Sequence, residues 1–157
     1  MNDYEQTLAI AASPAAVHAA LTSIAGLRAW WTDDCEGDAA PDGSFTVRFG
    51  ETEKTMRVED AGSPSEVRWT CTHAHLDLGP AARTDEWVGT IIVFRIEPDA
   101  GQGARLDFAH LGLTPALACH AVCSAGWQQF LGSLRAYLET GSGAPFRDPA
   151  LHERSAA

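Results

Sequence analysis

The sequence predicts an α+β domain with one antiparallel sheet of about six strands and a long C-terminal helix that covers it. Its segments follow the order strand, two short helices, five strands and a long helix. Most of the strands alternate apolar and polar residues, which is typical of a sheet with one wet face. The dry face needs a cover, and the final helix carries an unbroken apolar stripe that can supply it.

The chain begins with a strand expected at residues 4–11 and two short helices. Ser13 is a good N-cap and Pro14 suits the first helical position, so the pair marks the start of the first helix. A second short helical segment is expected over 27–31. These helices precede the main run of strands.

Five further strands are expected after an acidic loop at 33–43, with another loop at 78–84. They span 44–50, 54–60, 66–75, 86–97 and 104–111. Alternate residues of a strand share a face, so the pattern predicts which side chains point inward. The inward set that could meet a ligand is Trp69, Cys71, His73, Phe94, Phe108 and His110.

The chain closes with a long helix expected at about 115–139. A Thr-Pro pair at 114–115 is a start signal and Gly141 is a stop signal. Gly126 in the middle costs about 1 kcal/mol relative to alanine, so we expect that something needs the space beside it. The apolar stripe has His120 at its border and includes Cys119, Cys123 and Trp127.

The chain has 157 residues, which suits a single domain, here placed at 1–141 with a tail at 142–157. No apolar run approaches the roughly 18 residues of a membrane span. The N-terminus lacks the basic start of a secretory signal, so we expect a cytoplasmic protein whose four cysteines are thiols. Hydrophobic residues at 45% and charged residues at 20% are ordinary for a globular protein.

The net charge of −10 comes from 21 acidic and 11 basic residues. Nucleic acids and anionic membranes bind positive surfaces, so neither is expected as a partner. Lys54 is the only lysine, and arginine supplies the remaining positive charge. With the abundant alanine and glycine, this is interpreted as coding bias.

The order of segments and several local strings resemble the SRPBCC superfamily, also called START-like or helix-grip. The similarity is closest to the branch labelled activator of heat-shock protein 90 ATPase homologue. It covers nearly the whole chain and rests on the strings Ser13-Pro-Ala-Ala-Val17, Leu27-Arg-Ala-Trp-Trp31, Ala104-Arg-Leu-Asp-Phe-Ala-His110 and Gly126-Trp-Gln-Gln-Phe-Leu-Gly-Ser-Leu-Arg-Ala-Tyr-Leu138.

The resemblance implies a curved antiparallel sheet that grips the C-terminal helix, with a cavity between the two. Similar proteins use this cavity for lipids, sterols, polyketides or other small apolar molecules. Some are cyclases or hydratases, some carry ligands, and the chaperone-linked members regulate an ATPase. A fold shared by so many functions does not select one of them.

The cysteines of the final helix raise the alternative of a metal or redox site. Cys119 and Cys123 are four residues apart and would share a helix face, opposite Cys71, His73 or His110. Zinc needs three or four such ligands, but the spacing lacks the specificity of a metal motif. Buried thiols more often act as small hydrophobes, so we favour cavity lining and expect no metal or cofactor.

His110 matches a position where histidine is frequent in the similar branch, and there it can hydrogen-bond within the fold. An inward histidine could also act as an acid or base. No carboxylate is securely predicted on the inner face to orient it. For His73 and its neighbour His75, we favour a satisfied inner residue and a solvated one over a pair of ligands.

Trp30 and Trp31 end the second helical segment near the expected mouth of the cavity. One is expected in the core and the other at the ligand, since aromatic side chains supply large contact areas. Cys35 lies in the acidic loop, whose carboxylates disfavour a thiolate, so it is not expected to be a nucleophile.

The function expected from the sequence is binding of a small hydrophobic or amphipathic molecule between sheet and helix. The alternatives are a cyclase or hydratase that uses His110 or His120, which is less favoured, and a chaperone ATPase regulator or other interaction module. A homodimer is the further partner considered. The expected ligand-contacting residues are Trp31, Trp69, Cys71, His73, Phe94, Phe108, His110, Cys119, His120, Cys123 and Trp127.

Overall fold

The structure is a computed structural model that describes residues 3–60, 65–77, 84–99, 101 and 103–147 of the chain. The expected loop at 78–84 lies almost entirely outside the described residues, as does the end of the expected tail. No helix in the described part of the chain is long and apolar enough to cross a bilayer.

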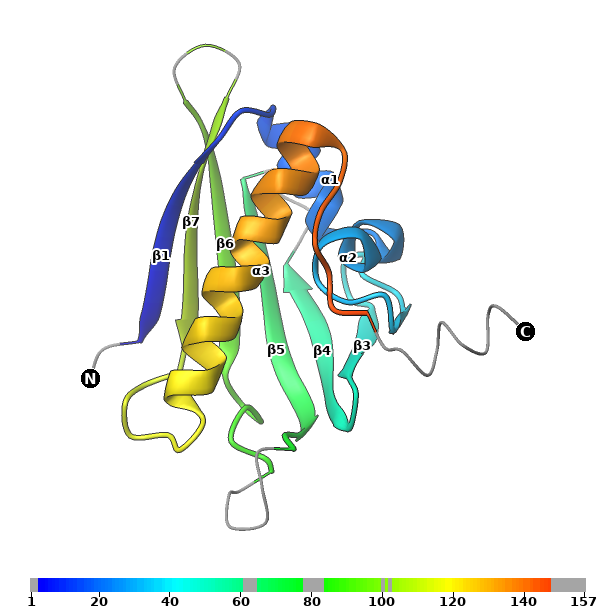
Figure 1. The fold of residues 1–157 in the computed structure, drawn as a ribbon, viewed down its shortest axis with the longest axis vertical. Helices are drawn as coiled ribbons and strands as arrows, with labels where there is room; N and C mark the ends of the chain where they lie inside the picture. The colour runs from blue at the N-terminus through cyan, green and yellow to red at the C-terminus, as the bar shows by residue number, and fades with distance from the viewer. Residues whose placement is uncertain (1–2, 61–64, 78–83, 100, 102, 148–157) are drawn as a thin grey trace.

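One antiparallel sheet forms the body of the molecule (Figure 1). Its strand order is β1-β7-β6-β5-β4-β3-β2. Each strand from β2 to β6 therefore pairs with the next one along the chain, and β1 pairs with β7. The strands are β1 Tyr4–Ile10, β2 Cys35–Gly37, β3 Ser44–Phe49, β4 Thr52–Asp60, β5 Glu66–His75, β6 Ile91–Pro98 and β7 Ala104–Leu111.

The sheet has seven strands where about six were expected, because part of the acidic loop pairs as β2. Cys35, the first residue of this edge strand, lies opposite Val47 of β3 and is buried. A three-residue strand is too short to show alternation, so only its pairing with β3 reveals it.

Among the described residues, three helices complete the fold: α1 Pro14–Leu21, α2 Ile24–Trp30 and α3 His120–Thr140. The Ser13 hydroxyl caps α1 by accepting a hydrogen bond from the N–H of Ala16 at 3.1 Å. Gly141 ends α3 at φ 87°, a left-handed conformation that glycine adopts without strain. Helix α3 crosses one face of the sheet, and α1 and α2 lie beside its C-terminal half (Figure 1).

Helix α3 begins five residues later than the Thr-Pro signal predicts. Residues 115–119 form turns, and Cys119 occupies the N-cap position, but its side chain does not cap the helix with a hydrogen bond to a backbone N–H group. The Glu86 carboxylate instead accepts hydrogen bonds from the N–H groups of Ala118 at 3.0 Å and Cys119 at 2.9 Å. A distant acidic residue therefore satisfies donors that a local cap would have satisfied.

The strand expected at 86–97 also starts late, since β6 begins at Ile91. Residues 86–89 form turns, and these place Trp87 inside the molecule. Thr90, just before the strand, is buried.

The expectation that His73 points inward is wrong. In the pairing of β4 with β5, Thr55 lies opposite His73 and Met56 opposite Cys71, so Thr72 is an extra residue. Such a bulge moves the following side chains to the other face of the sheet. His73 is consequently exposed, whereas Cys71 remains buried.

The five tryptophans of the chain are all buried between the sheet and the helices. Trp31 stacks on Trp30 at 5.6 Å, on Trp69 at 5.7 Å and on Trp127 at 5.3 Å between ring centroids. Trp127 also stacks on Trp87 at 5.9 Å. These rings fill much of the space between α3 and the sheet, so any cavity is confined to one side of them.

Candidate ligand-binding pocket

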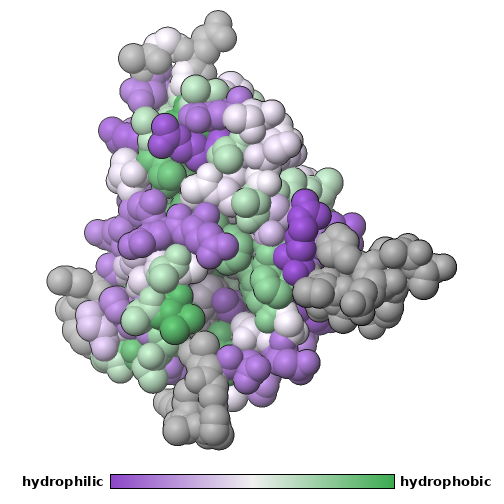
Figure 2. All heavy atoms as spheres, viewed as in Figure 1, coloured by the Kyte–Doolittle hydropathy of each residue, from purple (hydrophilic) through white to green (hydrophobic). Residues whose placement is uncertain are grey.

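A pocket of about 260 Å³ lies between the N-terminal half of α3 and the β3–β4 side of the sheet. Figure 2 shows this face of the molecule hollowed beside α3, with apolar side chains on both sides of the hollow. The residues that line it come from the end of α2, from β3 and β4, from the segment between β5 and β6, from α3 and from the chain after α3. They are Trp31, Phe49, Thr52, Lys54, Leu76, Trp87, Val122, Cys123, Gly126, Trp127, Gln129, Phe130 and Phe146.

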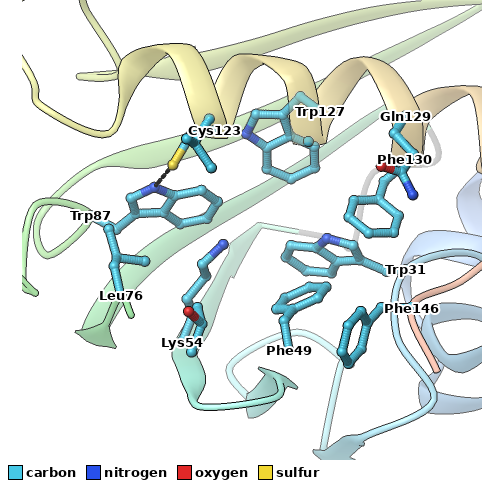
Figure 3. Close-up of a pocket in the computed structure, with 13 residues that line it drawn as sticks. Trp31, Phe49, Lys54, Leu76, Trp87, Cys123, Trp127, Gln129, Phe130 and Phe146 are labelled. Carbon is cyan, nitrogen blue, oxygen red and sulfur yellow. Dashed lines mark hydrogen bonds between the residues drawn. The ribbon is translucent and has the colours of Figure 1, made fainter. Parts of the chain in front are cut away.

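Six of the thirteen residues that line the pocket are aromatic (Figure 3). Trp31 and Trp127 are 2% exposed and belong to the stack that continues into the core. Phe49 contacts Phe130 and Phe146, each at 5.6 Å between ring centroids. The pocket therefore offers flat apolar surfaces from several separate elements, as small-molecule sites commonly do.

Gly126 contributes the open side of the helix to this pocket. A Cβ added there would have no neighbouring atom within 4 Å. The space that the mid-helix glycine was expected to serve is thus the pocket itself.

Lys54 is the charged residue of the pocket wall. It lies on the same side of β4 as Met56 and Val58, which are buried in the core. Its Nζ atom is 3.6 Å from the centroid of the Trp87 ring and 5.0 Å from that of Phe49. In the described part of the chain no carboxylate forms an ion pair with this ammonium. Burial lowers the pKa of Lys54 to about 8.

Cys123 lies one helical turn before Trp127 and also lines the pocket. Its sulfur accepts a hydrogen bond from the indole N–H of Trp87 at 3.2 Å (Figure 3). A hydrogen bond from the Cys119 thiol, the Lys54 charge and this indole N–H lower the pKa of Cys123 below the usual thiol value. The same thiol pair raises the pKa of Cys119, so Cys123 is the thiol that ionises first.

His110 links two walls of the pocket, Trp127 and Trp87, through a chain of hydrogen bonds. The Trp127 indole N–H donates to His110 Nδ1 at 3.0 Å, and His110 Nε2 lies 2.8 Å from the Thr90 hydroxyl. That hydroxyl donates to the carbonyl of Trp87 at 2.6 Å, so the ring carries its hydrogen on Nε2. Burial, with the Lys54 charge, lowers the pKa of His110 to about 3 and keeps the ring neutral.

The structure places the eleven residues predicted from the sequence in four groups. Three line the pocket: Trp31, Cys123 and Trp127. Six are buried outside its lining: Trp69, Cys71, Phe94, Phe108, His110 and Cys119. His73 is exposed on the other face of the sheet, and His120 is half-buried in the first turn of α3. Of Trp30 and Trp31, the first is core and the second lines the pocket, and contact of Trp31 with a ligand stays a prediction.

Sequence reasoning missed Lys54, Trp87, Phe49 and Phe130 as pocket residues. The sequence could have indicated Lys54, because it lies two and four residues before the inward-facing Met56 and Val58 and therefore shares their face of the strand. No such pattern indicates Trp87, since its position depends on turns that local pattern does not show. Phe146, which lies in the segment expected to be a tail, contacts Phe49.

The side chains considered for a metal site do not converge. Among the described residues, no three histidine, cysteine or acidic side chains form a group that could hold an ion. His73 points away and both ring nitrogens of His110 have partners. Burial raises the pKa of Cys71 to about 11. Burial and the nearby carboxylates of Asp34 and Glu36 raise the pKa of Cys35 to about 12.

A curved antiparallel sheet packed against a long C-terminal helix, with a pocket between them, defines the helix-grip class of α+β proteins. The chain belongs to the family described as Activator of Hsp90 ATPase homolog 1-like protein, whose sequence profile matches residues 11–139. Both the fold class and the family expected from the sequence are thereby confirmed. A search of curated proteins found no match to the chain.

Solved structures share this fold. The Aha1 dimer from Colwellia psychrerythraea is 28% identical, with 91% of this chain and all of that chain covered, at a TM-score of 0.74. CV1439 from Chromobacterium violaceum is 22% identical over 88% of this chain and 99% of its own, at a TM-score of 0.66. DynU16, of the dynemicin biosynthetic locus, is 20% identical over 91% of this chain and 49% of its own, at 0.67. The last two show the fold alone.

Proposed function

We propose that the protein binds a small hydrophobic or amphipathic molecule in the pocket beside the N-terminal half of α3. The observation that carries the proposal is an aromatic-walled pocket of about 260 Å³ with one lysine in its wall. Pockets for drug-sized ligands usually measure roughly 300 to 1,000 Å³ and combine apolar walls with a few polar groups. This pocket suits a ligand at or below the small end of that range.

The mid-helix glycine supports a binding role. Gly126 weakens α3 by about 1 kcal/mol relative to alanine, and its missing side chain leaves the pocket open. A helix that served only as a cover would gain stability from a larger residue at this position.

The test is to fill the pocket from the helix. Indole and naphthalene serve as probes, with binding followed by saturation-transfer NMR and by protection of Cys123 from alkylation. Gly126→Leu should abolish binding and protection, because the new side chain occupies the pocket. The matched control is Gly132→Leu, which adds the same side chain at an exposed position of the same helix.

Binding that persists in Gly126→Leu would place the ligand elsewhere and contradict the proposal. Absence of binding in the unmodified protein, with native mass spectrometry showing no co-purifying molecule, would also contradict it. Gly132→Leu should bind the probes as the unmodified protein does.

The family gives a second candidate, regulation of a chaperone ATPase. The family description names an Hsp90 ATPase activator, and the 28% identical Aha1 structure is a dimer. We therefore keep chaperone binding, a homodimer and a cytoplasmic location as proposals. ATPase rates with and without the protein, and its mass by light scattering at several concentrations, test the first two. Unchanged rates and a constant monomer mass would remove them.

The acid–base alternative has less support. His110 has both ring nitrogens in hydrogen bonds and lies outside the pocket lining, and His120 is likewise not a lining residue. A general base must reach the proton that it removes.

A further inference from the structure

We propose that the occupant of the pocket carries a carboxylate, which pairs with the Lys54 ammonium, on a flat apolar body. The inference rests on the proposed binding function and specifies the chemistry of the ligand. It follows from the position of the one lysine of the chain and from the groups that surround it.

The Lys54 ammonium has no anionic partner in the described part of the chain, although acidic residues are plentiful. Its strand neighbour Glu53 interacts with Arg48 at 3.9 Å. Glu86, on the segment that carries Trp87, accepts the N–H groups at the start of α3. These two carboxylates are thus engaged elsewhere.

Aromatic rings compensate this charge only in part. Trp87 lies 3.6 Å from Nζ, a cation–π arrangement, and Phe49 lies at 5.0 Å. An ammonium has three N–H donors, and no oxygen of the described residues accepts a hydrogen bond from Nζ. The Lys54 side chain is half-buried, so solvent reaches its ammonium in the ligand-free protein. A ligand that enters the pocket displaces this solvent, and one that supplies carboxylate oxygens is therefore favoured over a neutral one.

The other titratable groups that face Lys54 do not replace a ligand anion. They are Cys71 on β5, His110 on β7, and Cys119 and Cys123 at the start of α3. Cys71, Cys119 and His110 stay uncharged near neutral pH. Only Cys123 ionises more easily than usual, and its sulfur already accepts hydrogen bonds from Trp87 and Cys119.

The shape of the rest of the ligand follows from the walls. Trp87 lies on one side of the Lys54 side chain, and Trp31, Phe49 and Phe130 lie on the other (Figure 3). Flat apolar groups make the largest contact with such surfaces. The overall net charge of −10 repels anions at a distance, so selection of a carboxylate must occur at Lys54 itself.

The test compares naphthoate with naphthamide, two ligands of nearly equal shape that differ in charge. Titration calorimetry at pH 7 should show naphthoate binding at least about tenfold more tightly, the size of one desolvated charge pair. In Lys54→Met the preference should vanish while naphthamide still binds, since methionine keeps the apolar stem. Arg57→Met removes the same charge from an exposed position of the same strand and should keep the preference.

A further variant separates charge from side-chain identity. Lys54→Arg keeps a cation and should keep the preference for naphthoate.

Equal binding of both ligands by the unmodified protein would overturn the carboxylate inference and leave the binding function standing. A preference that survives in Lys54→Met would also overturn it. Binding of neither ligand, with no protection of Cys123 by any probe, would overturn the inference together with the binding function.

Discussion

Lys54 keeps a positive charge in surroundings that disfavour it. Its pKa of about 8 lies below the 10.5 of an ordinary lysine because the side chain is buried. Between these two pH values the unfolded chain binds more protons than the folded chain at this position. Stability therefore rises with pH across that window, and below pH 8 the full cost of the buried charge is present.

We predict that Lys54→Met stabilises the ligand-free protein at pH 7 by about 1 to 3 kcal/mol, since it removes a half-buried charge that no carboxylate pairs with. The gain should shrink as pH rises from 8 to 10.5, where the original lysine loses its proton in the folded state. Urea unfolding at several pH values measures both effects.

Arg57→Met is the control, because Arg57 is exposed on the same strand. It should change stability little and leave the pH dependence in this window unaltered. A gain for Lys54→Met that stays constant between pH 8 and 10.5 would show that the charge is not its cause.

At the scale of elements, the hydrogen-bond chain through His110 joins β7, α3 and the segment that carries Trp87. His110 contacts Trp127 on one side and Thr90 on the other, and Thr90 holds the Trp87 carbonyl. Without this chain, the two tryptophan walls would lose their common anchor. The buried histidine thus acts as a structural link between pocket walls.

We predict that His110→Gln destabilises the protein by about 2 to 4 kcal/mol at pH 7, because it breaks a satisfied buried network. The His110 pKa is depressed to about 3, so the original protein loses stability as pH falls from 6.5 toward 3. The variant should lack this component of the acid limb. Unfolding free energies from pH 3 to 7 test the prediction.

His75, an exposed histidine of β5, provides the comparison. His75→Gln should leave stability and the acid limb nearly unchanged. An unaltered acid limb in His110→Gln would mean that His110 takes up its proton in the folded state near the ordinary pH.

Much of the fold follows from local signals, and the exceptions have non-local causes. Ser13 and Gly141 mark helix ends correctly, because their roles depend on neighbouring residues. The Thr-Pro pair at 114–115 misplaces the start of α3, since Glu86 caps that end from another segment. The bulge at Thr72 reverses the direction of His73, and it depends on the pairing with β4.

The pocket was predictable in kind but only partly in its residues. Trp31, Cys123 and Trp127 follow from helical spacing and the expected cover of the sheet. The inner sheet face was expected to supply Trp69, Phe94 and Phe108 to the cavity. These rings instead pack against one another and against Trp31 and Trp127, and so fill that region. How large side chains divide a space between core and cavity depends on packing that a single sequence does not reveal.

At the scale of the whole molecule, the chain returns to the domain after α3. The N–H of Phe146 donates to the Trp31 carbonyl at 2.9 Å, and its own carbonyl accepts from Asp33 at 3.0 Å. The N–H of Ala144 donates to the hydroxyl of Ser133 at 2.7 Å. Contacts that build the pocket thus extend past residue 141, where the domain was expected to end, and that boundary remains a prediction.

We predict that a chain ending at residue 141 loses about 2 to 4 kcal/mol of stability, because it lacks the half-buried Phe146 side chain and the hydrogen bonds of this segment. It should also bind naphthalene more weakly, because the Phe146 wall is missing. A chain ending at residue 147 keeps every one of these contacts and serves as the control. Thermal unfolding and calorimetry distinguish the two, and equal behaviour would show that 1–141 is the complete domain.

The single lysine has a practical consequence for handling the molecule. Reagents that acylate amines can modify only Lys54 and the chain terminus, and Lys54 stands in the pocket wall. Random dye labelling or coupling to a sensor surface through amines would therefore block the pocket in a fraction of molecules, and that fraction would rise with pH as the amine loses its proton. Attachment through an added terminal tag leaves the pocket free.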